Sequence, residues 1–226
     1  MKTLVIGFGE IGQSLYNVLR GNYDVGYIDR HTEYNVERAE IIHICFPPSD
    51  KFIEQVKEYQ ARFNPKYTII HSTVSIGTTA QLNAIHSPCL GIHPHLEESM
   101  RVFPKYLGGP QASEVADYFR RAGLKVYLFD KSETTELLKI LDTTYYGVCI
   151  EYTKDIKRQC EKYGVPFEAW TVYNNFYNEC YPKLGHPEFV RPNLIPIMQK
   201  IGAHCVLPNL ELLETPFTSF LKKLND

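Results

Sequence analysis

The chain has 226 residues, 44% hydrophobic and 22% charged, which are the proportions of an ordinary globular protein. Its formal net charge of −2 argues against a general binder of nucleic acid or anionic membranes, and no run approaches the roughly 18 apolar residues of a membrane span. The six scattered cysteines form no C-x-x-C pair and the first strand leaves no room for a signal peptide, so we expect a cytoplasmic protein without a zinc site or a disulfide framework.

The first predicted elements are a strand, a glycine-rich turn and a helix. Residues 3–6 form a short apolar run, and three glycines follow it in the spacing G-x-G-x-x-G. In a dinucleotide-binding fold such glycines allow a tight turn, the close approach of a pyrophosphate, and close helix–strand packing. The helix after them would point its amides at the phosphates; a glycine-rich turn without a ligand is the alternative. The predicted binding residues here are Gly7, Phe8, Gly9, Glu10, Ile11 and Gly12.

A second strand is predicted to end in the acid Asp29. This residue lies about twenty positions after the first glycine, where a carboxylate accepts hydrogen bonds from ribose hydroxyls and repels a 2′-phosphate. The spacing therefore favours NAD over NADP as the cofactor. The neighbouring Arg30 keeps NADP open, and S-adenosylmethionine is a further ligand of such turns.

Further strands and helices alternate along the chain and predict an α/β fold with a parallel, doubly wound Rossmann sheet. The expected strands cover residues 41–46, 67–71, 89–92, 106–107 and 125–129. One helix is expected to begin after an N-cap at Ser49-Asp50. Two further helices are expected over residues 78–85 and 113–122. Ligands bind at the carboxyl ends of such strands. The residues expected there are Cys45, Phe46, Pro47, Ser72 and Thr73, with His93, Pro94 and His95 after the fifth strand.

The pattern becomes wholly helical after residue 130. A helix is predicted from Ser132 to near Cys160, about 30 residues or roughly 45 Å long, followed by one over 167–180 and by short helices. So long a helix needs more cover than a small domain gives. We therefore predict a Rossmann domain over 1–130 and an all-α domain over 131–226 that forms a homodimer through the long helix.

Two stretches carry candidate catalytic side chains. Lys139 and Thr143 lie four residues apart on one helix face, and a lysine beside a nicotinamide can exchange the substrate hydroxyl proton. Cys205, beside His204 in a turn of small residues, has the setting of a thiolate nucleophile. A solvated lysine and a buried core thiol are the respective alternatives.

The order of these segments resembles the UDP-glucose/GDP-mannose dehydrogenase superfamily, within the 6-phosphogluconate dehydrogenase-like group, over nearly the whole chain. Residues 44–48 (ICFPP) are similar to its I-C-V-P-T-P turn, and residues 72–78 (STVSIGT) to its S-T-V-P-x-G-T string beside the nicotinamide. Residues 136–143 resemble its E-L-x-K-x-x-x-N helix, which makes Lys139 the catalytic lysine. Residues 202–205 resemble its G-G-H-C turn, which makes Cys205 the nucleophile, and residues 189–192 resemble the stretch before that turn.

The departures from the family pattern bear on the substrate. Thr143 stands for the helix asparagine, Asn209 for an aspartate, and His95 for a glutamate of the loop at 93–99. The sequence ends at Asp226, where the family continues into a nucleotide-sugar-binding domain. Residues 91–94 resemble the G-x-H-P turn of prephenate dehydrogenases, in which the histidine polarises the substrate hydroxyl.

The sequence predicts an NAD-dependent oxidoreductase acting on the CH-OH group of a small polar substrate, either sugar-like or a hydroxy acid. A non-catalytic or regulatory cofactor-binding protein, and a prephenate or β-hydroxyacid type of dehydrogenase, are the alternatives.

Overall fold

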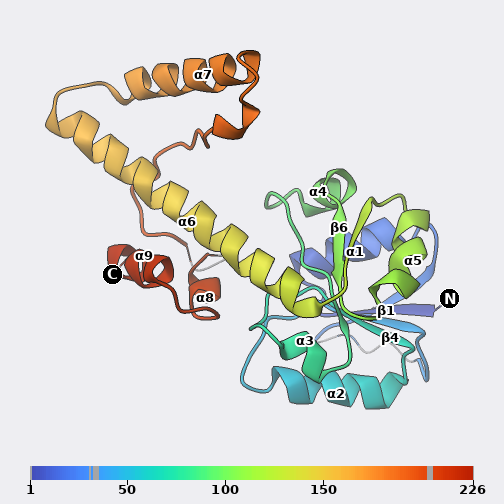
Figure 1. Ribbon diagram of the computed structural model, residues 1–226. Coiled ribbons are helices and arrows are strands. Elements are labelled where there is room, and N and C mark those ends of the chain that lie inside the picture. Colours follow the sequence, from blue (N-terminus) through green and yellow to red (C-terminus); the bar gives the residue numbers. More distant parts are fainter. Residues whose placement is uncertain (1, 31, 33–35, 203–205, 226) are drawn as a thin grey trace. The chain divides into compact units, whose positions relative to one another are not determined.

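The computed structural model describes residues 2–30, 32, 36–202 and 206–225. The chain divides into two compact units, Met1–Ile140 and Leu141–Asp226. The division lies inside one helix, α6 (Ser132–Lys162), which the ribbon in Figure 1 shows as a single continuous element. No loop therefore connects the two units at this point.

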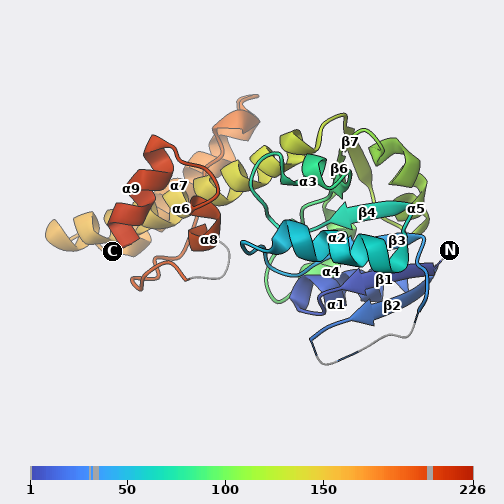
Figure 2. The same cartoon turned by 90° about the horizontal axis from the view of Figure 1, so that it is seen from below.

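The first unit holds, within its described residues, a seven-stranded sheet in the order β2-β1-β3-β4-β5-β6-β7, and Figure 2 shows its helices on both sides. The strands are β1 (Lys2–Ile6), β2 (Asp24–Ile28), β3 (Ile41–Ile44), β4 (Tyr67–Ile70), β5 (Ile85–His86), β6 (Lys105–Gly108) and β7 (Val126–Phe129). The helices are α1 (Glu10–Leu19), α2 (Phe52–Phe63), α3 (Thr78–Gln81), α4 (Leu96–Val102) and α5 (Ala116–Arg121), the last preceded by the 3-10 turn η1 (Ala112–Val115).

The predicted Rossmann-type doubly wound sheet is confirmed, and its direction changes once. Strands β1 to β5 pair in parallel, whereas β5 and β6 pair antiparallel through residues 86 and 108, and β6 and β7 are again parallel to each other. The carboxyl ends of β1 to β5 therefore share one edge of the sheet, and those of β6 and β7 lie at the other.

Two predictions between β4 and β6 differ from the structure: one helix is shorter than predicted, and one predicted strand is wrong. The helix expected over 78–85 ends at Gln81, because Asn83 takes a left-handed conformation with φ of +48°, and β5 begins two residues later. The strand expected over 89–92 is a loop, since Pro88 before it cannot donate to a strand ladder and Gly91 has φ of +151°.

Two helix starts also differ from the predictions. Helix α2 begins at Phe52 with Lys51 as its N-cap and no side-chain cap bond, so Ser49 and Asp50 do not cap it as expected. The backbone carbonyl of Ser49 instead accepts the N–H of Phe52 at 2.9 Å. Helix α4 was not predicted, although acids in its first turn and Arg101 in its last match the helix dipole.

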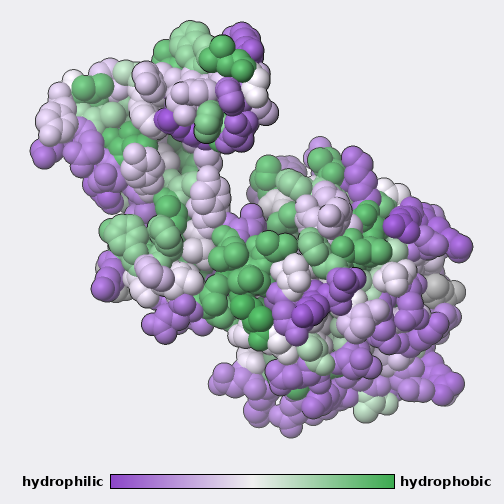
Figure 3. Space-filling model, in the orientation of Figure 1, coloured by the Kyte–Doolittle hydropathy of each residue, from purple (hydrophilic) through white to green (hydrophobic). Residues whose placement is uncertain are grey.

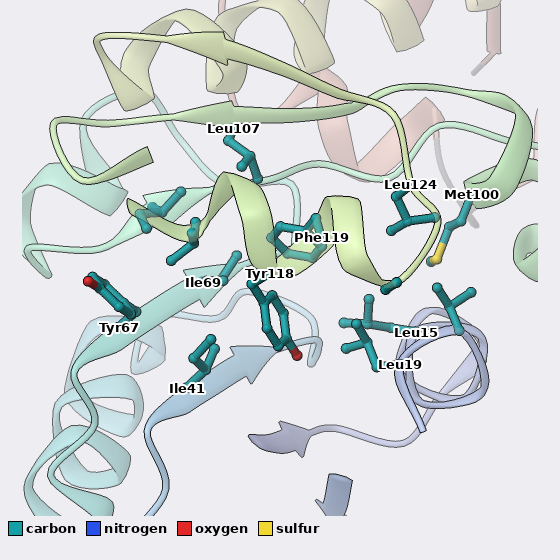
Figure 4. Close-up of a cluster of buried hydrophobic side chains, with 14 of the residues drawn as sticks. Leu15, Leu19, Ile41, Tyr67, Ile69, Met100, Leu107, Tyr118, Phe119 and Leu124 are labelled. Carbon is teal, nitrogen blue, oxygen red and sulfur yellow. The ribbon is translucent and has the colours of Figure 1, made fainter. Parts of the chain in front are cut away.

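Alternate residues of the central strands belong to two separate hydrophobic clusters, one on each face of the sheet. Val5, Ile41 and Ile69 pack with helices α1 and α5, as the close-up in Figure 4 shows for Ile41 and Ile69. Their neighbours Ile42 and Ile70 pack on the other face with α2. Both faces are covered, which explains why these strands are continuous apolar runs.

The second unit is helical in its described residues. Besides the rest of α6 it contains α7 (Phe167–Lys183), the 3-10 turn η2 (Pro187–Phe189), α8 (Val206–Leu210) and α9 (Pro216–Asn225). Its small core joins Ile201, Val206, Leu210 and Leu221. A side chain at Gly147 would lie 2.8 Å from Val206, so α6 needs a glycine where α8 and α9 approach it.

Large apolar side chains remain exposed along α6 and α7. Tyr145 and Tyr152 of α6 are 60% and 62% exposed, and Tyr173 and Phe176 of α7 are 64% and 61% exposed. Figure 3 shows apolar residues at the surface of both units. Apolar surface of this extent marks an interaction surface more often than a solvated face.

Candidate functional site

The three glycines of the first turn lie in different surroundings, and the structure itself requires only two of them. Gly7 has φ of +91°, and a Cβ there would lie 2.7 Å from the backbone nitrogen of Phe46. A Cβ on Gly12 would lie 2.0 Å from the carbonyl oxygen of Gly7, whereas one on Gly9 would meet no atom within 4 Å. Packing within the chain therefore accounts for Gly7 and Gly12, and open space lies beside Gly9.

Helix α1 begins at this open space. Its N-cap is Gly9, which makes no side-chain cap bond, and the helix is ten residues long. The first amides of a helix have no partner within the helix and carry the positive end of its dipole. The turn thus presents backbone donors beside a position where no side chain intrudes.

Beside the turn, the end of β2 carries the predicted ribose-binding acid. Asp29 and Arg30 are both exposed, and the backbone of Asp29 pairs with that of Thr32. The ring of Phe8 stacks on Tyr27 of β2 at 3.7 Å between centroids and 15° between planes. The side chain of Phe8 therefore packs the turn against β2.

The loops after β3 and β4 form a second wall next to Gly7. The hydroxyl of Ser72 donates to the carbonyl of Phe46 at 2.6 Å and ties the two loops together. Pro47 is exposed and Thr73 is half-buried, so both are open to a ligand. Burial raises the pKa of the Cys45 thiol well above its usual range, so this thiol stays protonated.

The start of α6 is attached to the loop after β4. The carboxylate of Glu136, which is fully buried, accepts the backbone N–H of Gly77 at 2.6 Å and of Thr79 at 2.8 Å. Lys139 lies one turn further along α6 and is half-buried. The sequence assigned Glu136 no role, because its partners lie 57 and 59 residues earlier in the chain.

A second attachment of α6 runs through His86 of β5. Its Nε2 lies 3.2 Å from the carbonyl oxygen of Ser72, and its Nδ1 lies 2.8 Å from the hydroxyl of Thr135. Burial lowers the pKa of His86 to about 3, with smaller contributions from the charges of Lys105 and Lys139. The imidazole is therefore neutral, and the charge of Lys139 contributes to keeping it so.

The segment 93–95 reaches the glycine-rich turn, although no strand precedes it. Nδ1 of His93 lies 2.6 Å from Oε2 of Glu10 in the first turn of α1. His95 is exposed at the N-cap of α4 and lines a polar groove of about 610 Å³ between α1 and α4, together with Glu10, Pro94 and Arg101. The structure thus brings the predicted histidines beside the predicted cofactor turn.

The other predicted catalytic residues belong to the second unit. Nδ2 of Asn209 donates to Oγ1 of Thr143 at 3.2 Å, and both side chains are buried. The two residues, both of which depart from the family pattern, are therefore hydrogen-bonded to each other. His204 and Cys205 lie outside the described residues.

A buried polar cluster beneath the sheet was not predicted. Nδ1 of His43 lies 2.9 Å from Nε2 of His71, whose Nδ1 is 2.8 Å from the carbonyl of Ser87 and 3.1 Å from Nζ of Lys105. Burial lowers the pKa of His43 to about 3 and that of His71 well below its usual value, and the charge of Lys105 adds to both effects. In the sequence, the only indication of this cluster is that a histidine, His43, interrupts the apolar run 41–44.

Within the described residues, no three His, Cys, Asp or Glu side chains form a group that could hold a metal ion. The same residues include no helix that is long and apolar enough to cross a membrane.

Comparisons with known proteins support the resemblance stated from the motifs. No family model matches the chain. A curated UDP-N-acetyl-D-mannosamine dehydrogenase from Methanocaldococcus jannaschii is 23% identical over 89% of this chain and 50% of its own length. The chain therefore spans about half the length of this relative.

Solved structures agree in fold. The UDP-D-ManNAc dehydrogenase of Pyrococcus horikoshii superposes with a TM-score of 0.81 at 15% identity, over 100% of this chain and 68% of its own. The 3-hydroxyisobutyrate dehydrogenase of Mycobacterium tuberculosis gives 0.71 at 13% identity, over 98% of this chain and 91% of its own. The chain thus shares its fold with sugar-nucleotide and hydroxyacid dehydrogenases, and resembles the former in sequence over most of its length.

Proposed function

We propose that the chain is an NAD-dependent oxidoreductase that acts on the CH-OH group of a small polar substrate, sugar-like or a hydroxy acid. One observation carries the proposal: at Gly9, the N-cap of α1, no atom of the described chain beyond the two neighbouring residues lies within 4 Å of the position of a Cβ, and the first amides of the helix have no partner within it. A pyrophosphate fits such a place, because it supplies acceptors for the amides and needs close backbone approach.

The residues around this space suit the rest of a dinucleotide. Asp29 would accept hydrogen bonds from the ribose hydroxyls, which favours NAD. The neighbouring Arg30 could pair with a 2′-phosphate, so NADP is the alternative cofactor. Pro47 and Thr73, on the wall tied together by Ser72, would flank the nicotinamide. When bound, NAD supplies the hydride acceptor of the reaction.

Lys139 is proposed to hold and move the substrate hydroxyl proton. The neutral amine accepts the hydroxyl proton, and the ammonium so formed stabilises the negative charge that develops on that oxygen. His93 and His95 are proposed to share this proton transfer, since a ring nitrogen of histidine can donate or accept a proton. Their place beside the glycine-rich turn supports this role.

Cys205, with His204 beside it in the sequence, is proposed as a thiol nucleophile on the strength of the family resemblance. Its thiolate would add to an aldehyde to give a thiohemiacetal, and loss of a second hydride would give a thioester. Water would then hydrolyse the thioester to the acid and release the thiol. Thr143 and Asn209 would take the places of the family's asparagine and aspartate.

A β-hydroxyacid or prephenate type of dehydrogenase is the second candidate. Two observations support it: this chain covers 91% of the 3-hydroxyisobutyrate dehydrogenase that it resembles in fold, and Thr143 and Asn209, which depart from the sugar-nucleotide pattern, bond to each other. In that case the reaction stops after one hydride, and Cys205 is a packed thiol. A non-catalytic, regulatory cofactor-binding protein is the alternative from another class.

We also propose a homodimer in the cytoplasm. The dimer is supported by the exposed apolar side chains along α6 and α7, and its test is the oligomeric state in solution. Neither nucleic acid nor a membrane is proposed as a partner.

Thermal shift with NAD, NADP and S-adenosylmethionine tests the cofactor. A ligand at a hundred times its Kd stabilises the fold by about 2.7 kcal/mol, so NAD should raise the Tm clearly and more than NADP. If neither dinucleotide raises the Tm, the cofactor proposal is wrong.

Two substitutions then separate the oxidation steps once a substrate is found. Cys205→Ser should abolish acid formation and leave alcohol–aldehyde exchange, whereas Lys139→Ala should slow both. Unchanged rates with Cys205→Ser would make the thiol structural, and a bound cofactor without turnover of any hydroxy compound would favour the regulator.

A further inference from the structure

We propose that Glu136 is a positioning residue that couples the loop after β4, residues 72–79, to the first turns of α6, which carry Lys139. The inference rests on the proposed nucleotide site and adds to it a route by which occupation of the site reaches the proton-carrying lysine. Two independent sets of contacts support it.

The first set belongs to the carboxylate itself. Glu136 is fully buried, and its two oxygens accept one backbone N–H each, from Gly77 at 2.6 Å and Thr79 at 2.8 Å. A buried carboxylate is costly unless it is hydrogen-bonded, and bonds to a charged acceptor are about twice as strong as neutral ones. Both bonds lead to the same loop, so the loop and α6 move as one body while the bonds hold.

The second set joins the same two segments through a histidine. Nε2 of His86 lies within hydrogen-bond distance of the carbonyl oxygen of Ser72, and its Nδ1 lies 2.8 Å from the hydroxyl of Thr135. That hydroxyl itself donates to the carbonyl of Ser132 in the first turn of α6. Thr135 is thus linked through His86 to Ser72 at the start of the loop, and its neighbour Glu136 bonds directly to Thr79 at the end of the loop.

The position of Lys139 follows from these attachments. It lies three residues after Glu136, and side chains three apart share one face of a helix. Its charge also contributes to the lowered pKa of His86, the histidine that Thr135 contacts. A shift of the loop when a dinucleotide binds beside Thr73 would therefore displace or fix Lys139 directly.

Hydrogen exchange with and without NADH tests the coupling. In the wild-type protein NADH should slow exchange both in residues 7–14 and in residues 132–140. In Glu136→Gln the amide group offers only one acceptor and turns a donor toward a backbone N–H. NADH should still protect residues 7–14 there, while its protection of 132–140 falls by about tenfold.

Glu151→Gln is the matched control, because Glu151 is also a buried carboxylate of α6 but bonds to Lys154 within the second unit. It should lose stability and keep the NADH effect on residues 132–140. A Glu136→Gln protein that keeps this effect would overturn the coupling.

If Glu136→Gln does not fold, Glu136→Asp keeps the charge but shortens the side chain, and unaltered NADH protection of 132–140 in it would equally refute the proposal. NADH that fails to protect residues 7–14 in the wild type would instead remove the nucleotide site on which the coupling depends.

Discussion

Gly9 and Gly12 stand three residues apart in one turn, yet a side chain would meet very different surroundings at each. Space is open at Gly9, whose φ of −72° suits any residue, whereas a Cβ on Gly12 would lie 2.0 Å from a backbone oxygen. Gly9→Ala should therefore leave the Tm nearly unchanged and abolish the thermal shift by NAD. Gly12→Ala should cost about 3 kcal/mol of unfolding free energy through overpacking, besides losing NAD. A Gly9→Ala protein that still responds to NAD would show that no pyrophosphate approaches this residue.

The buried histidines make folding sensitive to acid. The pKa values of His43 and His86 fall from 6.5 to about 3 on burial, so below pH 6.5 the unfolded chain takes up protons that the folded chain does not. Stability that is present above pH 6.5 is therefore lost as the pH falls toward 3, by about 2 kcal/mol for each histidine between pH 7 and pH 5.

Urea unfolding at these two pH values measures the loss. His86→Gln should reduce the pH-dependent loss by about 2 kcal/mol. His186→Gln, at an exposed histidine of the second unit, should leave it unaltered. A stability that does not change between pH 7 and pH 5 would contradict neutral burial of these imidazoles.

The predicted cofactor residues were accessible from the sequence because their signals are local. The spacing of three glycines, an acid after the next strand and prolines after the third lie within short windows. The contacts of Glu136 and His86 have no such signal, since each joins segments about fifty or more residues apart. Sequence patterns report local geometry, and these bonds exist only once the sheet has formed.

At the scale of elements, the length of a strand decided whether it could be predicted. Strands β1, β3 and β4 have four or five residues in continuous apolar runs, and the long helix predicted from Ser132 is confirmed at 31 residues. Strand β5 has only two residues, too few for any periodicity. The sequence therefore predicts the strand at the neighbouring apolar run 89–92 instead of at residues 85–86.

Helix α6 contains a buried ion pair, whose removal should change the stability of the protein. Nζ of Lys154 lies 2.6 Å from Oε1 of Glu151, and both side chains are nearly inaccessible. Glu151→Leu alone should cost about 3–5 kcal/mol because it leaves a buried cation unpaired. Glu151→Leu combined with Lys154→Met should restore most of the loss, as two apolar groups need no partner. Chemical denaturation of the four proteins measures the coupling, and additive losses would contradict it.

For the whole molecule, the prediction concerns self-association. Leu141, Tyr145 and Tyr152 recur on one face of α6 at spacings of four and seven residues, and each is more than 40% exposed. We expect sedimentation to show a dimer at micromolar concentration and Tyr152→Glu to shift it to a monomer. Arg158→Glu, on another face of the same helix, is the control and should remain dimeric. A wild-type monomer would leave these side chains to some other partner.

The bonds of Glu136 and Thr135 also decide how this architecture can be taken apart and rebuilt. Cutting the chain at residue 130, where the sequence pattern changes, would leave His86 and the amides of Gly77 and Thr79 without the acceptors and donors that α6 gives them. The nucleotide-binding unit is complete only when it includes the first turns of the long helix. A module exchanged between proteins of this type, in evolution or in engineering, must therefore carry its own piece of α6, with the seam inside the helix after residue 140.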